Sequence, residues 1–181
     1  WSLASDVAIF AVGGAAMALL MIDEGVWPAI NDVVVIAESA LAASAFAGLA
    51  TLAVNRPRPF LYSDRAPLSV RNHPEGGLSF ISGHSAVGFA IIVSTYIAMN
   101  RLHPKIGDPL PIISLAIGGA AMTFVTVGRV LGGNHFITDA LAGVAIGTAF
   151  GILIPALHRA PVKVLPMASS QQVSITLLAD F

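Results

Sequence analysis

Long apolar runs separated by short polar stretches form the main pattern along the chain. Charged residues and prolines divide it into five apolar segments, each close to the roughly 20 residues that cross a hydrocarbon core as an α-helix. The segments lie at about Leu3–Ile22, Pro28–Val54, Gly76–Asn100, Pro109–Gly128 and Phe136–Leu157. The pattern predicts an all-α fold, an integral membrane helical bundle of about five spans.

Small and polar residues inside the segments indicate how the helices pack. Gly143, Gly147 and Gly151 recur at four-residue spacing, which predicts a smooth stripe for close helix contact. Asp32 and Glu38 lie inside the second segment and need a partner there; an interhelical hydrogen bond is favoured over a proton path. Buried helices of a soluble domain are the alternative, but several apolar runs of this length in one short chain disfavour it.

The pattern changes after Pro161. From Gln172 to Phe181, apolar Val, Ile and Leu alternate with Ser and Thr in the two-residue period of a strand. Nothing else in the chain has the pattern of an outer-membrane barrel. We therefore divide the chain into a membrane-embedded domain, residues 1–160, and a C-terminal tail, residues 161–181, with one β-strand.

Loop parity constrains the topology. Consecutive spans place alternate connections on alternate sides, so Asn55–Glu75 and Arg129–His135 share one side. Basic residues in the short loops of the other side favour that side as cytoplasmic. The sequence thus predicts an inner-membrane protein of a bacterium, with the two polar loops facing the periplasm or the exterior.

Composition agrees with a membrane location. Hydrophobic residues make up 56% of the chain, charged residues 10%, and the mean hydropathy is +0.82, well outside the range of ordinary soluble proteins. A formal net charge of −1 gives no reason to expect a nucleic-acid partner. The absence of cysteine excludes disulfides, thiolate nucleophiles and thiolate metal sites. Because the sequence begins at Trp1 rather than Met, we expect it to be a fragment.

Three polar clusters remain, and all lie on the shared side. They are residues 55–59 (Asn-Arg-Pro-Arg-Pro), residues 79–85 (Ser-Phe-Ile-Ser-Gly-His-Ser), and Arg129 with His135 and Asp139. Singly, the arginines are explained as surface anchors, the Ser-Gly-His as a helix cap and each histidine as a satisfied polar residue. Together, two histidines, three arginines and an acid are costly at membrane depth without a function.

These groups suit phosphoryl transfer, in which fixed cations and donors must meet charge on the equatorial oxygens. Arg58 and Arg129 can each bind phosphate through a planar fork. Ser82 is expected where a helix begins, so the N–H groups of Gly83 and His84 would point at an anion.

The two histidines suit two different roles. His135 and Asp139 are four residues apart, so on one helix face the carboxylate could hold one imidazole nitrogen and leave the other free to attack. His84 could give a proton to the departing oxygen, because histidine titrates near neutrality.

The clusters resemble the three signature motifs of the type 2 phosphatidic acid phosphatase superfamily, which also includes vanadium haloperoxidases. In that family, a Lys is followed seven residues on by Arg-Pro; the second motif is Pro-Ser-Gly-His; the third is Ser-Arg, five residues, His, three residues and Asp. The matching residues, in correct order and spacing, are Arg58, Pro59, Ser82, Gly83, His84, Arg129, His135 and Asp139. The resemblance covers most of the chain.

The resemblance implies roles for the matched residues. His135 would form a phosphohistidine, Asp139 would orient it and His84 would act as general acid. The implied phosphate-binding residues are Arg58, Ser82, Gly83 and Arg129. Neither a metal nor another cofactor is implied, and His73, His103 and His158 stand alone in loops without ligand-spaced partners, so we expect them to be solvated. Since the family usually has six spans, five spans suggest that the first is missing.

The chain also departs from the family motifs. Thr51 stands where Lys is expected, Ile81 where Pro is expected and Gly128 where Ser is expected. Loss of one well-placed phosphate-binding cation typically costs about 2.7 to 4 kcal/mol of transition-state stabilisation. Arg56 is the first candidate to replace it, ahead of Arg65 and Arg71 in the loop.

The expected function is metal-independent hydrolysis of a phosphate ester or diphosphate on a membrane lipid, through a phosphohistidine intermediate. The expected partners are the phosphorylated lipid and the bilayer. One alternative is a catalytically weak or silent relative that binds or moves phospholipid, as the missing lysine suggests. A vanadium-dependent haloperoxidase is a third interpretation, which the membrane spans disfavour.

Overall fold

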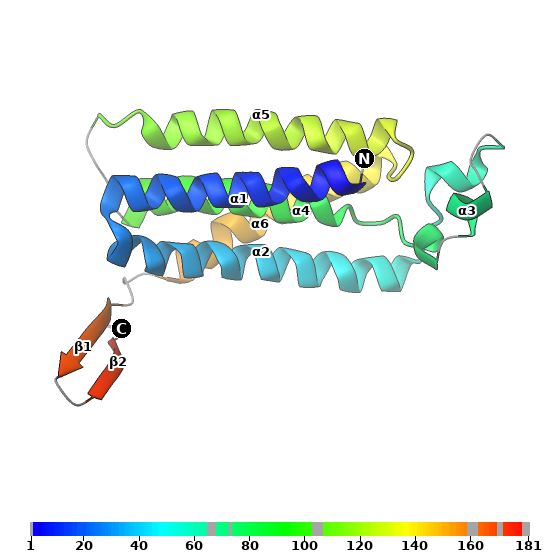
Figure 1. Cartoon of the computed structure of the whole chain (residues 1–181). Coiled ribbons are helices and arrows are strands. Elements are labelled where there is room, and N and C mark those ends of the chain that lie inside the picture. Colours follow the sequence, from blue (N-terminus) through cyan, green and yellow to red (C-terminus); the bar gives the residue numbers. More distant parts are fainter. Residues whose placement is uncertain are drawn as a thin grey trace.

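Helices build nearly the whole fold (Figure 1). The computed structural model describes residues 2–64, 68–72, 74–102, 107–158, 163–169 and 172–178. In this part of the chain the long helices are α1 (Ser2–Glu24), α2 (Val26–Val54), α4 (Gly83–Ile97), α5 (Leu110–Leu131) and α6 (Ile137–Leu157). The short elements are η1 (Pro59–Tyr62), α3 (Leu68–Arg71), η2 (Pro74–Gly77) and the π-helical turn η3 (Ala98–Leu102).

The long helices form a membrane-type bundle around α4. Helices α1, α2, α5 and α6 are each long and apolar enough to cross a bilayer. Helix α4 has 15 residues, is continued by the five residues of η3, and packs against all four of the others. Large apolar side chains such as Phe10, Leu41 and Ile117 are exposed on the outer helices. An apolar outer surface of this kind is stable in lipid and not in water.

Helix α4 begins later than the apolar pattern predicts. The third segment was expected to start near Gly76, whereas the helix starts at Gly83. Just before that start, Ser79 N donates to Arg56 O at 2.9 Å and Ser82 N donates to Asp139 O at 3.1 Å. These hydrogen bonds to distant segments hold the backbone ahead of α4 outside the helix.

Close contact between α4 and α6 depends on the predicted glycine stripe. Gly143, Gly147 and Gly151 are buried on α6. A Cβ atom added to Gly143 would lie 2.5 Å from the carbonyl oxygen of Ser82, a separation that real Cβ atoms do not show. The stripe therefore confirms the expected packing and brings the start of α4 against α6.

The two polar connections meet at the same end of the bundle, as loop parity predicts. Figure 1 shows the α2–α4 and α5–α6 connections together at the end where α1 begins. Phe60 N donates to Gly133 O at 3.1 Å and ties one connection to the other. The α1–α2 turn at Gly25 lies at the opposite end, whereas Lys105, on the α4–α5 connection, lies outside the described residues.

Apolar side chains also cover part of the α2–α4 connection. Tyr62 and Leu68 are 72% and 73% exposed. The Tyr62 ring lies 6.4 Å from the Phe136 ring, centroid to centroid. An aromatic ring with a polar tip is typical of the boundary between lipid and water. The connection therefore suits the headgroup region of a membrane.

The C-terminal tail contains a hairpin rather than a single strand. Strand β1 (Lys163–Ser169) pairs antiparallel with β2 (Gln172–Leu178), with Lys163 opposite Leu178. β2 lies in the segment where the alternating pattern indicates a strand. β1 was missed because it contains Pro166 and lacks the two-residue alternation. Phe181 lies outside the described residues.

Glu38 and His158 form an interhelical contact. His158 Nε2 lies 3.2 Å from Glu38 Oε2, and its Nδ1 donates to Ile154 O at 2.9 Å. The interhelical interpretation of Glu38 is thus confirmed, whereas the expectation of a solvated His158 is wrong. The reason is that the end of α6 packs against the middle of α2. His73 and His103 lie outside the described residues.

Candidate active site

The three polar clusters meet at the end of the bundle shared by the two connections. Arg58 follows α2, His84 lies in the first turn of α4, and Arg129 lies in the last turn of α5. His135 lies just before α6, and Asp139 lies in the first turn of α6. The guanidinium groups of Arg58 and Arg129 are close enough to act electrostatically on both histidines. Residues far apart in the sequence are therefore gathered into one site.

His135 is buried and is held in one tautomer. Its Nδ1 lies 2.7 Å from the carbonyl oxygen of Ser79, which can only accept, so Nδ1 carries the hydrogen. Burial is the main cause that lowers the pKa of His135 to about 4, with smaller contributions from Arg129 and Arg58. At neutral pH the ring is uncharged, and Nε2 presents its lone pair 3.3 Å from Arg129 Nη2. A neutral ring in this position could act as a nucleophile toward an anion held by Arg129.

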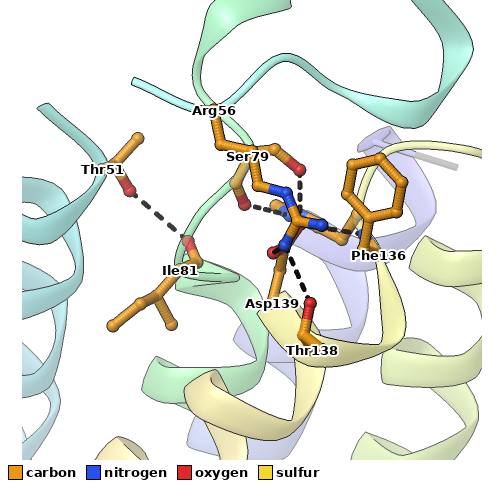
Figure 2. A network of polar contacts seen from close by, with 8 residues as sticks. Thr51, Arg56, Ser79, Ile81, Phe136, Thr138 and Asp139 are labelled. Atoms are coloured by element: carbon orange, nitrogen blue, oxygen red, sulfur yellow. Dashed lines mark hydrogen bonds and ion pairs between the residues drawn. The ribbon is translucent and has the colours of Figure 1, made fainter. Parts of the chain in front are cut away.

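Asp139 is fully buried and accepts three hydrogen bonds. The donors are Arg56 Nη1 at 2.7 Å, Ser79 Oγ at 2.5 Å and Phe136 N at 2.9 Å (Figure 2). The expected direct contact between this carboxylate and His135 is therefore wrong. His135 precedes the N-cap residue Phe136, so the four-residue spacing does not put the two side chains on one helix face.

Ser79 connects Asp139 to His135. Its hydroxyl donates to the carboxylate, and its carbonyl accepts from the imidazole. Sequence reasoning gave Ser79 no role, because the second family motif covers residues 81–84 and a carbonyl contact leaves no trace in residue type. The carboxylate can still orient the ring, but through the backbone of a third residue.

Arg56 is bound to Asp139. Its Nη1 atom donates to both Asp139 Oδ1 and Thr138 Oγ1, at 2.7 and 2.8 Å, and its guanidinium carbon lies 3.9 Å from the centre of the Phe136 ring. Figure 2 shows the side chain reaching across the start of α6. Arg56 therefore serves first as the counter-charge of a buried carboxylate, and its expected use as a replacement phosphate ligand has to rely on its remaining donors.

Among the described residues, Thr51 adds no charge where the family motif has a lysine, and Arg71 is paired elsewhere. Thr51 Oγ1 donates to Ala47 O at 2.7 Å and lies 3.4 Å from Ile81 O, beside the loop that precedes α4 (Figure 2). Arg71 pairs with Asp64 at 3.7 Å within the α2–α4 connection. Arg65 lies outside the described residues.

The start of α4 has the expected form of an anion site. Ser82 is the N-cap residue, and a Cβ atom added at Gly83 would meet nothing within 4 Å, so this face of the helix terminus is open. The Ser82 hydroxyl is buried 3.0 Å from Ser85 Oγ, which lies 3.1 Å from Thr126 Oγ1. The backbone of the first turn is thus left to face an anion, while the serine hydroxyls link α4 to α5.

His84 has a partner that sequence reasoning missed. Its Nε2 lies 2.8 Å from Asp6 Oδ1 on α1. The available signal was composition, since Asp6 is the sole acidic residue within Leu3–Ile22. An isolated acid in an apolar span calls for a polar partner.

Arg58 and Arg129 are anchored by the loops around them. Arg58 N donates to Gly76 O at 2.8 Å, and Arg58 Nε donates to Leu78 O at 3.3 Å. Arg129 is buried, and its carbonyl accepts from Asn134 N at 3.0 Å. Among the described residues, no group of three or more His, Asp or Glu side chains is arranged to hold a metal ion.

Comparisons with known proteins identify the family and the fold. The family model described as PAP2 superfamily matches residues 32–163. Among solved structures, the chain is similar to one described as the crystal structure of the first transmembrane PAP2 type phosphatidylglycerolphosphate phosphatase from Bacillus subtilis, at 23% sequence identity and a TM-score of 0.55. The similarity covers 82% of this chain and 66% of that chain, and at this identity it shows a shared fold. No curated protein matches.

Proposed function

Because the chain belongs to the PAP2 superfamily, we propose that it is a membrane lipid phosphatase that hydrolyses a phosphate ester or diphosphate of a lipid. The observation that carries the proposal is the buried, uncharged ring of His135, whose Nε2 lies 3.3 Å from Arg129 Nη2. A neutral imidazole nitrogen beside a guanidinium can attack a phosphorus atom whose oxygens the guanidinium holds.

The first chemical step forms a phosphohistidine. His135 Nε2 attacks phosphorus, the bond from phosphorus to the lipid oxygen breaks, and His84 gives its proton to that oxygen. Arg58, Arg129 and the N–H groups at the start of α4, including that of Gly83, balance the charge on the equatorial oxygens. In this step Asp139 stabilises the attacking ring through Ser79.

The second step releases inorganic phosphate. His84, now without its proton, takes one from a water molecule, whose oxygen attacks the phosphohistidine. The bond between phosphorus and Nε2 breaks, and His135 returns to its neutral form. One histidine therefore serves as acid and then as base, as the reversed direction of the second step requires.

The position of the candidate site supports a lipid substrate. The site lies at one end of an apolar bundle, so a phosphate carried on a lipid headgroup can reach it while the lipid tail stays in the bilayer. The similar Bacillus subtilis protein is a phosphatidylglycerolphosphate phosphatase, so a phospholipid phosphate monoester is the first substrate to test. We further propose a bacterial inner membrane, with the site facing the periplasm or exterior.

Phosphate release by the purified protein tests the proposal. Phosphatidylglycerolphosphate, phosphatidate and a polyprenyl diphosphate are each supplied in detergent micelles with an excess of EDTA. We expect release from at least one lipid, and we expect His135→Ala to lower it by about 10³-fold or more, as for removal of other catalytic nucleophiles. His158→Ala, which removes a histidine far from the site, should leave the rate unchanged. Loss of activity in EDTA with recovery on adding a divalent cation would contradict the histidine mechanism.

A second candidate function is a silent relative that binds or moves phospholipid. The observation in its favour is Thr51, whose hydroxyl is bonded to the backbone of its own helix where the family motif has a cation. This candidate predicts binding of the same lipids without release of phosphate. Thr51→Lys would then introduce turnover into a protein that has none, with Thr51→Met as the control for side-chain length.

A further inference from the structure

The contact between Asp6 and His84 joins the first helix to the candidate site. Asp6 Oδ1 lies 2.8 Å from His84 Nε2, and the two side chains are 53% and 23% exposed. Asp6 lies on α1, before the residues 32–163 that the family model matches. None of the three sequence motifs includes it. The contact is therefore a property of this chain that the motifs do not describe.

The presence of the Asp6 carboxylate in this helix requires a physical explanation. It lies within an apolar segment of α1, where an ionised group is costly unless it is paired. The histidine that it meets is already close to the positive charges of Arg58 and Arg129. Asp6 is the acidic group that faces this histidine, so the imidazole lies among two guanidinium groups and one carboxylate.

The contact has a chemical consequence because the two nitrogens of an imidazole ring point in different directions. With Nε2 bound to Asp6, Nδ1 of His84 is the nitrogen that remains for the leaving oxygen. The carboxylate accepts the hydrogen of Nε2 and fixes the rotation of the ring, so the second proton of the imidazolium lies on Nδ1. General-acid catalysis depends on both, since this Nδ1 proton is the one that faces the breaking bond.

We propose that Asp6 is a positioning residue of the active site, which holds His84 in the orientation that delivers a proton to the departing lipid oxygen. The inference rests on the proposed function and deepens it, because it makes α1 part of the site. Asp6 touches neither the phosphate nor the reacting atoms in this proposal and acts through His84 alone.

The experiment compares two substrates whose leaving groups differ in their need for a proton. From a short-chain phosphatidate the diacylglycerol leaves as an alkoxide, which must be protonated, whereas p-nitrophenyl phosphate releases a phenolate that needs no acid. The quantity to compare is kcat/KM, because it includes departure of the leaving group and excludes the later hydrolysis of the phosphohistidine. Asp6→Ala and His84→Ala are measured together with the unmodified protein.

We expect Asp6→Ala to lower kcat/KM for the phosphatidate by about tenfold to 10²-fold, the usual cost of misplacing a catalytic group. The value for p-nitrophenyl phosphate should change by less than about threefold under the same logic, since its departure does not use the acid. His84→Ala should show the same preference, more strongly. The double variant should be no worse than His84→Ala, because Asp6 acts through that ring.

Glu38→Ala is the matched control. It removes another carboxylate–imidazole contact between two helices, at the opposite end of α6, and should leave both substrates unchanged. Asp6→Asn keeps the shape and an acceptor for Nε2, so it replaces Asp6→Ala if that variant fails to fold, and it should show the same preference more weakly.

Two outcomes would contradict the proposal, one for the role of Asp6 and one for the assignment of His84 as general acid. If His84→Ala shows the leaving-group preference and the Asp6 variants lower both substrates equally, Asp6 is merely structural and the inference is wrong. If His84→Ala itself shows no preference, the assignment of the general acid in the proposed function fails, and the inference fails with it.

Discussion

At the scale of single residues, the burial of His135 predicts that its ring is uncharged at neutral pH, and this prediction can be tested. The ring is neutral at pH 7 because its pKa is lowered to about 4. We expect the NMR signal of this histidine, assigned with His135→Gln, to stay unchanged as the pH falls from 7 to about 5. Titration near the ordinary histidine pKa of about 6.5 would contradict the burial argument.

The same lowered pKa makes the stability of the folded protein depend on pH. The unfolded chain protonates this histidine near pH 6.5, whereas the folded chain does so only near 4. Between these values the unfolded state binds more protons, so the free energy of unfolding should decrease as the pH falls from 6.5 to 4. His135→Gln removes this contribution. The drop in Tm between pH 7 and pH 5, measured in detergent, should be smaller in the variant.

Ser79 offers a second test at the residue scale. Ser79→Ala removes the hydroxyl that donates to buried Asp139 but keeps the carbonyl that binds His135. A hydrogen bond to a charged group contributes about 1.5–3 kcal/mol, so we expect a loss of stability of that order together with a lower kcat. Ser94→Ala is the control, since this buried serine bonds only to the backbone of α4. Equal effects of the two variants on kcat would exclude a role for Ser79 in the site.

The sequence predicted which residues form the candidate site better than it predicted the contacts between them. Arg58, His84, Arg129 and His135 could be gathered in advance because residue type and loop parity both point to one end of the bundle. The hydrogen-bonding partners of these residues could not be predicted. The Ser79 carbonyl has no sequence signature, and the spacing of His135 and Asp139 predicts a contact only if both lie within one helix.

At the scale of helices, the packing of α4 on α6 sets the geometry of the site. The glycine stripe lets α6 approach the α4 backbone, and Ser82 N at the start of α4 donates to Asp139 O on α6. A change in the separation of these two helices would therefore move the proposed anion site relative to the network around Asp139.

Gly147→Ala tests the stripe. A Cβ atom there would collide with the backbone carbonyl of Ala86, which cannot move without shifting α4. We expect a loss of about 1–3 kcal/mol from overpacking, seen as a lower Tm in detergent, and reduced activity. Gly119→Ala on α5 is the matched control, because its Cβ would meet nothing within 4 Å. That control should be neutral or slightly stabilising, by up to about 1 kcal/mol. A Tm in Gly147→Ala as high as in Gly119→Ala would contradict the packing.

Apolar runs predicted the helices well, and the exceptions have a common cause. The late start of α4 is fixed by backbone hydrogen bonds to Arg56 and Asp139, which are distant in the sequence. Strand β1 exists through pairing with β2, although its own residues include Pro166. The hydrophobic pattern within one segment does not show which distant segment it will pack against or pair with.

At the scale of the whole molecule, the arrangement of the two ends predicts which side of the membrane each residue reaches. Helix α3, which ends at Arg71, lies at the site end of the bundle, and the start of α2, which contains Trp27, lies at the opposite end (Figure 1). The chain has no cysteine, so single cysteines at these positions can be labelled without background. A membrane-impermeant maleimide added to intact cells should label Arg71→Cys and leave Trp27→Cys unlabelled until the cells are opened. Labelling of both in intact cells would refute the proposed orientation.

The exposed apolar surface of the α2–α4 connection should determine how a lipid substrate arrives. We expect Tyr62 and Leu68 to lie in the headgroup layer, which would keep the rim of the candidate site in contact with lipid. A substrate then reaches His135 by lateral diffusion within two dimensions, and its effective concentration is its mole fraction among the surrounding lipids. Adding an inert phospholipid would slow the reaction even at constant bulk concentration of substrate. The turnover rate would thus depend on the lipid composition of the membrane around the protein.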